Sequence, residues 1–121
     1  MAGYTTTVKN ALLTTAIAQG TWISAHTGDP GTTGGSEVAG GSYGRVQTTW
    51  GTPAGADQSP STVTGSSVVF SIPASTAITH WGLWSDQTTG NWVTGGSLPA
   101  TAVYGITSGI YTLTPVLSQA G

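Results

Sequence analysis

The sequence predicts a mainly β protein, a compact antiparallel β-sandwich of jelly-roll-like type with one N-terminal helix. Short runs rich in Val, Ile, Thr and aromatic residues recur along most of the chain, and such runs are typical of strands. Segments of Gly, Pro, Ser and Asp separate them at the spacing expected of a sandwich or barrel. Only one stretch, near the N-terminus, has the apolar spacing of a helix.

The composition favours a folded domain with little surface charge. Its 121 residues predict an N-terminal arm or helix over residues 1–20 and a single β-sandwich domain over residues 21–121. Disorder needs few aromatics and high net charge, whereas this chain has five Trp, four Tyr and a net charge of -2. Charged residues make up 5% of the chain, against roughly 25% in typical soluble domains. Copies of such a protein repel one another weakly, which suits dense packing in an assembly.

Residues 6–19 are the one helix candidate, since Val8, Leu12, Ala16 and Gln19 fall near one face and Gly20 follows as a terminating glycine. The Thr-rich sequence has low intrinsic helix propensity. We therefore expect the helix to lay the side that carries Leu12, Leu13 and Ile17 against a sheet. The alternative is an arm that docks on a neighbouring subunit.

The rest of the chain is predicted as strands joined by turns. The expected strands cover residues 21–26, 43–50, 67–72, 77–85, 91–95, 101–104 and 110–117. The turn from Asp86 to Gly90 leads into the sequence NWVTGG, which predicts the second strand of a hairpin. In residues 78–84, alternation places Trp84 on one face and Trp81 on the other. This strand should be buried on both sides, between the core and either the helix or another copy, with both Trp residues as core anchors.

Evidence for chemistry is weak, and we predict no enzyme, no cofactor and no metal site. The chain has no Cys, so thiolate chemistry is excluded. His26 and His80 could join Asp29, Glu37 or Asp86 only if the fold gathered them, because their spacing matches no ligand signature. The alternative is a purely structural role, in which each His makes a local hydrogen bond and Asp29 and Asp86 form turns. No Ser lies in a G-x-S-x-G motif, and Asp57 is a lone carboxylate in a long loop.

Nucleic acid and membrane are not expected partners. Lys9 and Arg45 are the only basic side chains, too few to neutralise a row of phosphates. No run of about 18 apolar residues and no signal peptide is visible, which predicts a chain that is made in a cytoplasm and stays soluble. A sharper alternative is a receptor-binding module in which Trp50, Trp92 and Tyr104 stack on sugar rings.

One segment carries a family resemblance. The sequence AHTGDPGTTGGSEVAGGSYGR resembles a signature of small structural proteins of tailed bacteriophages, especially those of actinobacterial hosts, LHT-x-DPGTTG-x-x-EV-x-GG-x-Y-x-R. Ala25 stands where that pattern more often has Leu. The later sequence FSIPASTAITHWGLWSDQTTGNWVTGGSL is similar to the second half of that family, although Ser85 separates Trp84 from Asp86 where the family has G-L-W-D.

The resemblance implies a non-enzymatic structural protein on the exterior of the virion. Our leading hypothesis is a capsid decoration protein that bridges major capsid protein subunits and forms a small homo-oligomer such as a trimer. The alternative is a minor tail or tail-fibre protein that binds other tail proteins and the host surface. Glu37 and Arg45 flank a Gly-rich excursion and could pair to tie its base. The expected contact surfaces are the N-terminal segment and the loop of residues 28–43, and the expected interface residues are Tyr4, Leu12, Leu13, Asp29, Glu37, Tyr43 and Arg45.

Overall fold

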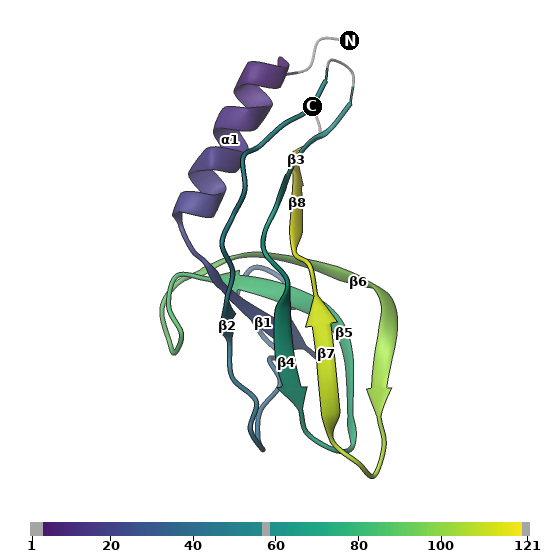
Figure 1. Cartoon of the computed structure of the whole chain (residues 1–121). Coiled ribbons are helices and arrows are strands. Elements are labelled where there is room, and N and C mark those ends of the chain that lie inside the picture. Colours follow the sequence, from purple (N-terminus) through teal and green to yellow (C-terminus); the bar gives the residue numbers. More distant parts are fainter. Residues whose placement is uncertain (1–3, 57–58, 120–121) are drawn as a thin grey trace.

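A computed structural model describes residues 4–56 and 59–119 as one helix and eight strands paired in antiparallel sheets (Figure 1). This confirms the predicted mainly β, sandwich-like fold with one helix. The elements are α1 (Thr6–Ala18), β1 (Trp22–His26), β2 (Val46–Gln47), β3 (Ser61–Thr64), β4 (Val68–Ile72), β5 (Thr76–Trp84), β6 (Trp92–Tyr104), β7 (Gly109–Leu113) and β8 (Val116–Gln119). Within the described residues, no helix is long and apolar enough to span a membrane.

Helix α1 matches the predicted range, and Leu13 and Ile17 face the core as expected, but Leu12 does not. Thr5 caps it, because its hydroxyl accepts a hydrogen bond from the Val8 amide at 3.3 Å. Lys9 and Leu13 are the buried residues of the helix, which packs against β3 and β8 of its own chain. Leu12, expected in the core, is 39% exposed. Lys9 lies on the inner face instead because its ammonium donates to the Ser59 carbonyl oxygen at 2.6 Å.

Four strands form the larger sheet in the order β2-β1-β5-β6. The predicted hairpin is confirmed: β5 and β6 pair, and the Ser85 amide closes their turn on the Asn91 carbonyl at 3.0 Å. Two expected strands, residues 91–95 and 101–104, merge into β6. The partner of Ile78 is Ala102 but the partner of His80 is Ser97. Extra residues therefore bulge from β6 near Pro99, as expected for a proline inside a strand.

Strands β3 and β4 run antiparallel to β8 and β7 as a broken two-stranded ribbon that stands in front of the β5–β6 hairpin in Figure 1. The Gly65 amide donates to the Pro115 carbonyl at 2.8 Å and joins the two halves. The expected strand 110–117 is split at Pro115, and β3 was not expected because its surroundings are rich in Gly and Pro. The expected strand 43–50 shortens to β2, with Trp50 bridging to Gly65.

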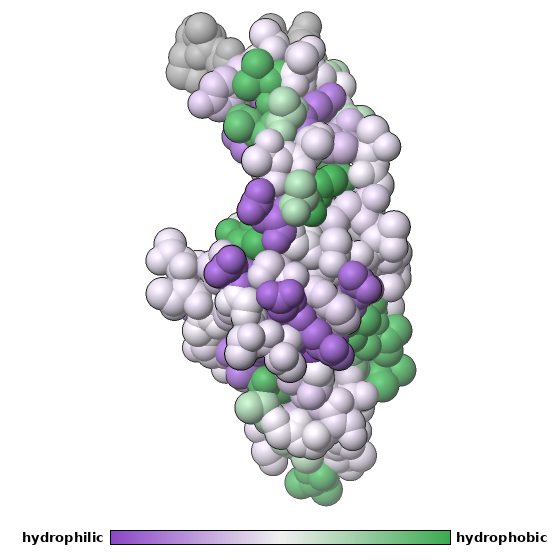
Figure 2. Space-filling model, turned by 90° about the vertical axis from the view of Figure 1, so that its left-hand side faces the viewer, coloured by the Kyte–Doolittle hydropathy of each residue, from purple (hydrophilic) through white to green (hydrophobic). Residues whose placement is uncertain are grey.

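One hydrophobic cluster joins the two layers. Its buried members are Leu13, Ile23, Ala25, Val38, Val63, Val68, Phe70, Ile72, Ile78, Trp81, Leu83, Leu98, Leu113 and Leu117. Strand β5 is buried on both sides as predicted, since Trp81, Gly82 and Leu83 are all buried. The ring of Trp84 contacts Arg45 and Trp92 of the same chain. Figure 2 shows a mostly pale surface with green groups near both ends, consistent with a chain poor in charge.

Candidate functional site

The loop of residues 27–45 has a fixed path over the end of β1. Asp29 Oδ1 accepts a hydrogen bond from the Gly31 amide at 2.8 Å, which confirms that Asp29 forms a turn. The chain then returns beside β1, where the Thr27 amide bonds the Ser36 carbonyl and the Val38 amide bonds the Ala25 carbonyl, each at 2.9 Å. Gly34 has φ +77° and lies against the rings of Trp84 and Trp92, so a side chain there would be strained and would collide.

Glu37 and Arg45 pair as the sequence predicted. Arg45 Nη2 lies 2.8 Å from Glu37 Oε1, and Arg45 Nε lies 2.9 Å from Glu37 Oε2. This bidentate geometry is the strong form of an Arg–carboxylate contact. The Tyr43 hydroxyl donates to Glu37 Oε2 at 2.9 Å and accepts from the Ala25 amide at 2.9 Å. Burial holds the pKa of Tyr43 well above its ordinary value, so the hydroxyl stays protonated.

Arg45 also ties the loop to the β5–β6 turn. Its Nη1 donates to the carbonyl oxygens of Asp86 at 3.0 Å and Thr89 at 2.8 Å. Its Cζ stands 3.7 Å from the centroid of a Trp84 ring, the arrangement of a cation–π contact. One side chain therefore connects the loop, the β5–β6 turn and a central aromatic residue.

A hydrogen-bonded chain runs beneath this loop. Trp84 Nε1 donates to Ser24 Oγ at 2.9 Å, and Ser24 Oγ lies 2.7 Å from His26 Nε2. His26 Nδ1 lies 2.7 Å from the Gly35 carbonyl oxygen, which can only accept. Nδ1 therefore carries the proton, and Nε2 accepts from the Ser24 hydroxyl. Burial lowers the pKa of His26 below 6.5, although the Gly35 carbonyl acts in the opposite direction.

The Ser24–His26 distance is that of a Ser–His catalytic pair, but the pair has no access to substrate. Both residues are 0% exposed. His26 Nδ1 faces a backbone carbonyl rather than the carboxylate that orients the histidine of a catalytic triad. The arrangement can hold the loop on β1, and a substrate could not reach it. No G-x-S-x-G motif marks this pair, and the only sequence signal for it is the two-residue spacing of Ser24 and His26 on one strand.

Strand register brings the two histidines together without forming a metal centre. His26 is the cross-strand partner of His80, and Glu37 bridges to His26. Both nitrogens of His26 are already engaged, and His80 Nδ1 lies 2.7 Å from the Thr79 hydroxyl. Each histidine thus makes a hydrogen bond within the chain, as expected for a structural histidine. In residues 4–56 and 59–119, no three His, Asp or Glu side chains gather as metal ligands; Asp57 lies outside the described residues.

The aromatic residues proposed to stack on sugars make contacts inside the molecule. Trp50 Nε1 donates to the Gly20 carbonyl at 3.0 Å, and the Tyr104 hydroxyl donates to the Ile110 carbonyl at 2.7 Å. The Trp92 ring packs edge-on against His26 and Trp84. All three side chains are partly buried, so none of them presents a fully open ring face.

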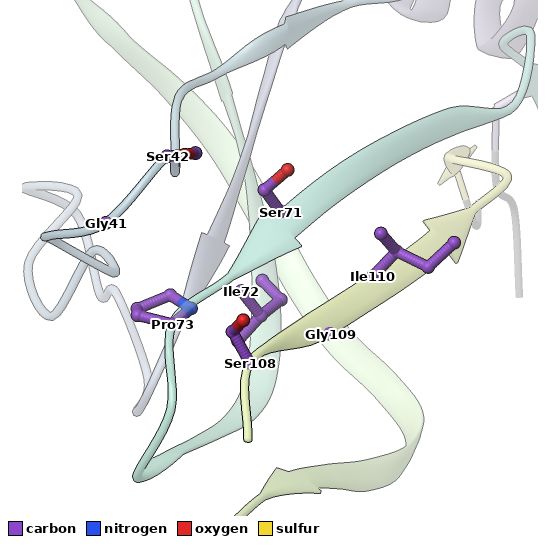
Figure 3. A pocket seen from close by; sticks show the side chains of 8 residues that line it. All are labelled: Gly41, Ser42, Ser71, Ile72, Pro73, Ser108, Gly109 and Ile110. Carbon is purple, nitrogen blue, oxygen red and sulfur yellow. The ribbon is translucent and has the colours of Figure 1, made fainter. Parts of the chain in front are cut away.

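One surface pocket, of about 320 Å³, lies between the loop of residues 37–45 and the turn of residues 87–89, with Glu37 and Arg45 in its lining. Two further surface pockets are also lined by polar groups. The first, of about 330 Å³, lies among three chain segments that converge in Figure 3, with residues 41–42, 71–73 and 108–110 around it. It contains the side chains of Ser42, Ser71 and Ser108 and no charged group. The second, of about 260 Å³, contains Asp29 and His80 beside the backbone of Gly95 and Gly96.

The expected interface residues fall into two groups. Tyr4, Leu12 and Asp29 are exposed and accessible to a partner. Glu37, Tyr43 and Arg45 belong to the hydrogen-bonded network that holds the loop, and Leu13 is buried on the inner face of α1.

A comparison with protein families gives one match: a family model described as "Podophage GP4 fiber I protein gp80" matches residues 4–109. The chain belongs to this family. The match to the phage fibre family runs from the residues before α1 to the first residue of β7, and it identifies the chain as a bacteriophage structural protein. The predicted resemblance to phage structural proteins is therefore confirmed at this level. No curated protein and no solved structure matches the chain.

The family is one of structural fibre proteins rather than of enzymes, and a buried hydrogen-bonded chain suits a protein whose work is to keep a shape. The network of Glu37, Tyr43 and Arg45 stabilises the loop that joins β1 to β2, which is the longest connection between consecutive strands.

Proposed function

We propose that this protein is a component of a tail fibre on the exterior of a phage particle and that it contacts the host surface. The observation that carries the proposal is the match of residues 4–109 to a fibre protein family. A chain with six charged residues among 121 suits dense packing in an assembly.

The helix end of the molecule is the proposed attachment point to other tail proteins. Val8 and Leu12 are 41% and 39% exposed, and their four-residue spacing places them on one side of α1. Tyr4, which precedes the helix, is 57% exposed. Helix α1 begins and β8 ends at this end of the molecule, opposite the end where β4 stops and β7 starts (Figure 1). An apolar stripe on a helix commonly packs against another protein.

We further propose that copies of the chain associate as a small homo-oligomer, such as a trimer. The sequence carries 2 basic and 4 acidic residues. Arg45 and Glu37 neutralise each other within one chain, so little like charge remains to separate identical surfaces. The loop of residues 28–43 is a second proposed contact surface, with Asp29 on its exposed side.

Location on the particle tests the proposal against capsid decoration. Antibody-labelled particles viewed by electron microscopy should carry label at the tail, and particles that lack the protein should adsorb poorly to host cells. Label spread over the head, with heads that become fragile to heat when the protein is absent, would instead support a decoration protein.

Substitutions on α1 test the attachment surface. Val8→Lys with Leu12→Lys should leave the isolated protein folded, because both side chains are exposed, but should reduce its incorporation into particles. Thr7→Lys with Thr14→Lys is the matched control, since these residues are also exposed on α1 but Thr14 lies on the other side of the exposed surface from Leu12. Equal incorporation of the two variants would contradict attachment through the apolar stripe.

A further inference from the structure

We infer that the pocket between residues 41–42, 71–73 and 108–110 binds a single neutral sugar unit of a host surface polysaccharide, an inference that rests on the proposed contact with the host. The pocket lies at the end of β4 and the start of β7, away from α1 (Figures 1 and 3). If α1 attaches the protein to the particle, this end faces outward.

The chemistry of the lining suits a neutral polyol. Ser42, Ser71 and Ser108 are exposed. Their hydroxyls make no hydrogen bond to another residue of the described part of the chain. A hydroxyl can both donate and accept, which is what sugar hydroxyls require. Pro73 and Ile110 add apolar surface beside these groups, and Ile110 is 69% exposed. An apolar patch next to a few polar groups is the usual make-up of a small-molecule site.

Two glycines, Gly41 and Gly109, line the pocket. A Cβ on Gly109 would lie 2.7 Å from the ring of Tyr104, and Gly41 has φ +58° and lies against Pro73. Neither position accepts a side chain without strain or collision. The volume of about 330 Å³ is at the lower limit of ligand pockets, roughly 300–1,000 Å³. It can therefore take one sugar unit rather than a long oligosaccharide.

The charges of the whole molecule argue against an acidic sugar. Lys9 and Arg45 are the only basic side chains in the sequence. The Lys9 ammonium donates to the carbonyls of Ser59 and Ala56, and Arg45 is bound to Glu37 and to two carbonyls. Neither lines the pocket. A uronic or sialic acid carboxylate, or a phosphate, would find no side-chain cation to pair with there.

Titration of the full-length protein with small sugars, followed by amide chemical shifts in NMR, tests the inference. The probes are the methyl glycosides of glucose, galactose, mannose and rhamnose, with glucuronic acid and N-acetylneuraminic acid as charged comparisons. At least one neutral glycoside should give saturable shifts at Ser71, Ser108 and Gly109, with a dissociation constant on the order of 1 mM, as expected for one small ligand.

Paired variants locate the binding. Ser71→Ala with Ser108→Ala should weaken binding about tenfold, because two hydrogen bonds are lost. Thr62→Ala with Ser118→Ala removes two exposed hydroxyls from a cross-strand pair elsewhere, on β3 and β8, and should leave binding unchanged. The inference is overturned if no neutral glycoside gives saturable shifts, if the Ser71 and Ser108 variant binds normally, if the shifts centre on Asp29 and His80, or if the acidic sugars bind equally well.

The sugar site and the fibre function can be contradicted independently, because the titration tests the first and the particle experiments test the second. Label at the tail and loss of adsorption, together with a blank titration, would overturn the sugar site and leave the fibre function standing. Saturable shifts in the pocket together with label on the head would keep the sugar site and remove the proposed tail location.

Discussion

The guanidinium of Arg45 lies over the indole of Trp84, with Cζ 3.7 Å from a ring centroid, while the same group binds Glu37 through two hydrogen bonds. Trp84 in turn donates to Ser24 in β1. The loop of residues 27–45 is therefore held from above by an ion pair and from below by the hydrogen-bonded chain of Ser24 and His26. Loss of either support should loosen the loop without removing the sheet beneath it.

Arg45→Ala should lower the free energy of unfolding by about 2–4 kcal/mol, because it leaves the carboxylate of Glu37 without its partner in a partly buried site. The side chains of Arg45 and Glu37 are only 9% and 22% exposed. Arg45→Lys should lose about half as much, since an ammonium keeps the charge but not the bidentate geometry. Urea unfolding measures both, with Thr112→Ala as an exposed control. A change of less than about 0.5 kcal/mol in Arg45→Ala would show that the pair does not support the fold.

The stability of the protein should fall as the pH drops below 6.5. The pKa of His26 is lower in the folded protein than its ordinary value of 6.5, so the unfolded chain takes up a proton first and unfolding becomes easier. The slope cannot exceed about 1.4 kcal/mol per pH unit, the limit for uptake of one proton, and it ends where the folded-state pKa is reached. Unfolding in urea at a series of pH values from 8 to 5 gives this slope.

Two substitutions assign the slope to one histidine. His26→Asn keeps a donor near the Gly35 carbonyl but cannot take up a proton, so its stability should change little over the same pH range. His80→Asn should keep the slope of the natural protein. A flat profile in the natural protein, or a slope that survives His26→Asn, would contradict the assignment to His26.

The strands could be predicted wherever a run of β-branched and aromatic residues stood between clear turns. Strands β1, β4 and β5 were found in this way. Strand β3 was missed because its four residues gain their strand character from pairing with β8, which is distant in the sequence. The two expected strands 91–95 and 101–104 merge into β6 because the strand continues through a bulge near Pro99. A proline in the sequence normally indicates the end of a strand instead.

The site was only partly predictable for a similar reason. In a chain with so few charges, Glu37 and Arg45 stood out as a pair, and they do pair. Ser24 and His26 stand two residues apart, so strand alternation alone places them on one face. The link from Trp84 to Ser24 depends on the register of β1 against β5, which no local pattern gives. The burial of Lys9 could not be predicted, because a single lysine on a helix normally lies at the surface. Its burial requires the carbonyl of Ser59, which is 50 residues away in the sequence.

Gly82→Ala should destabilise the protein by about 1–3 kcal/mol, the usual cost of overfilling a packed core. A Cβ there would collide with the Trp92 ring and lie 2.6 Å from Ser24 Oγ. Gly44→Ala is the matched control, since a Cβ at that position meets nothing within 4 Å, and it should be neutral or slightly stabilising. Thermal unfolding compares the two. Equal stability of both variants would show that Trp92 does not pack on β5 as described.

Lys9→Met should separate helix α1 from the segment that follows β2. Met retains the apolar stem of Lys9 but leaves the Ser59 carbonyl without the ammonium that lies 2.6 Å from it. The expected loss is about 1–3 kcal/mol in urea unfolding, with faster proteolysis near residues 54–60. Val8→Met changes the neighbouring, exposed position and should alter neither measurement. If Lys9→Met proves as stable and as resistant to protease as Val8→Met, the buried ammonium contributes nothing to holding the helix on the sheet.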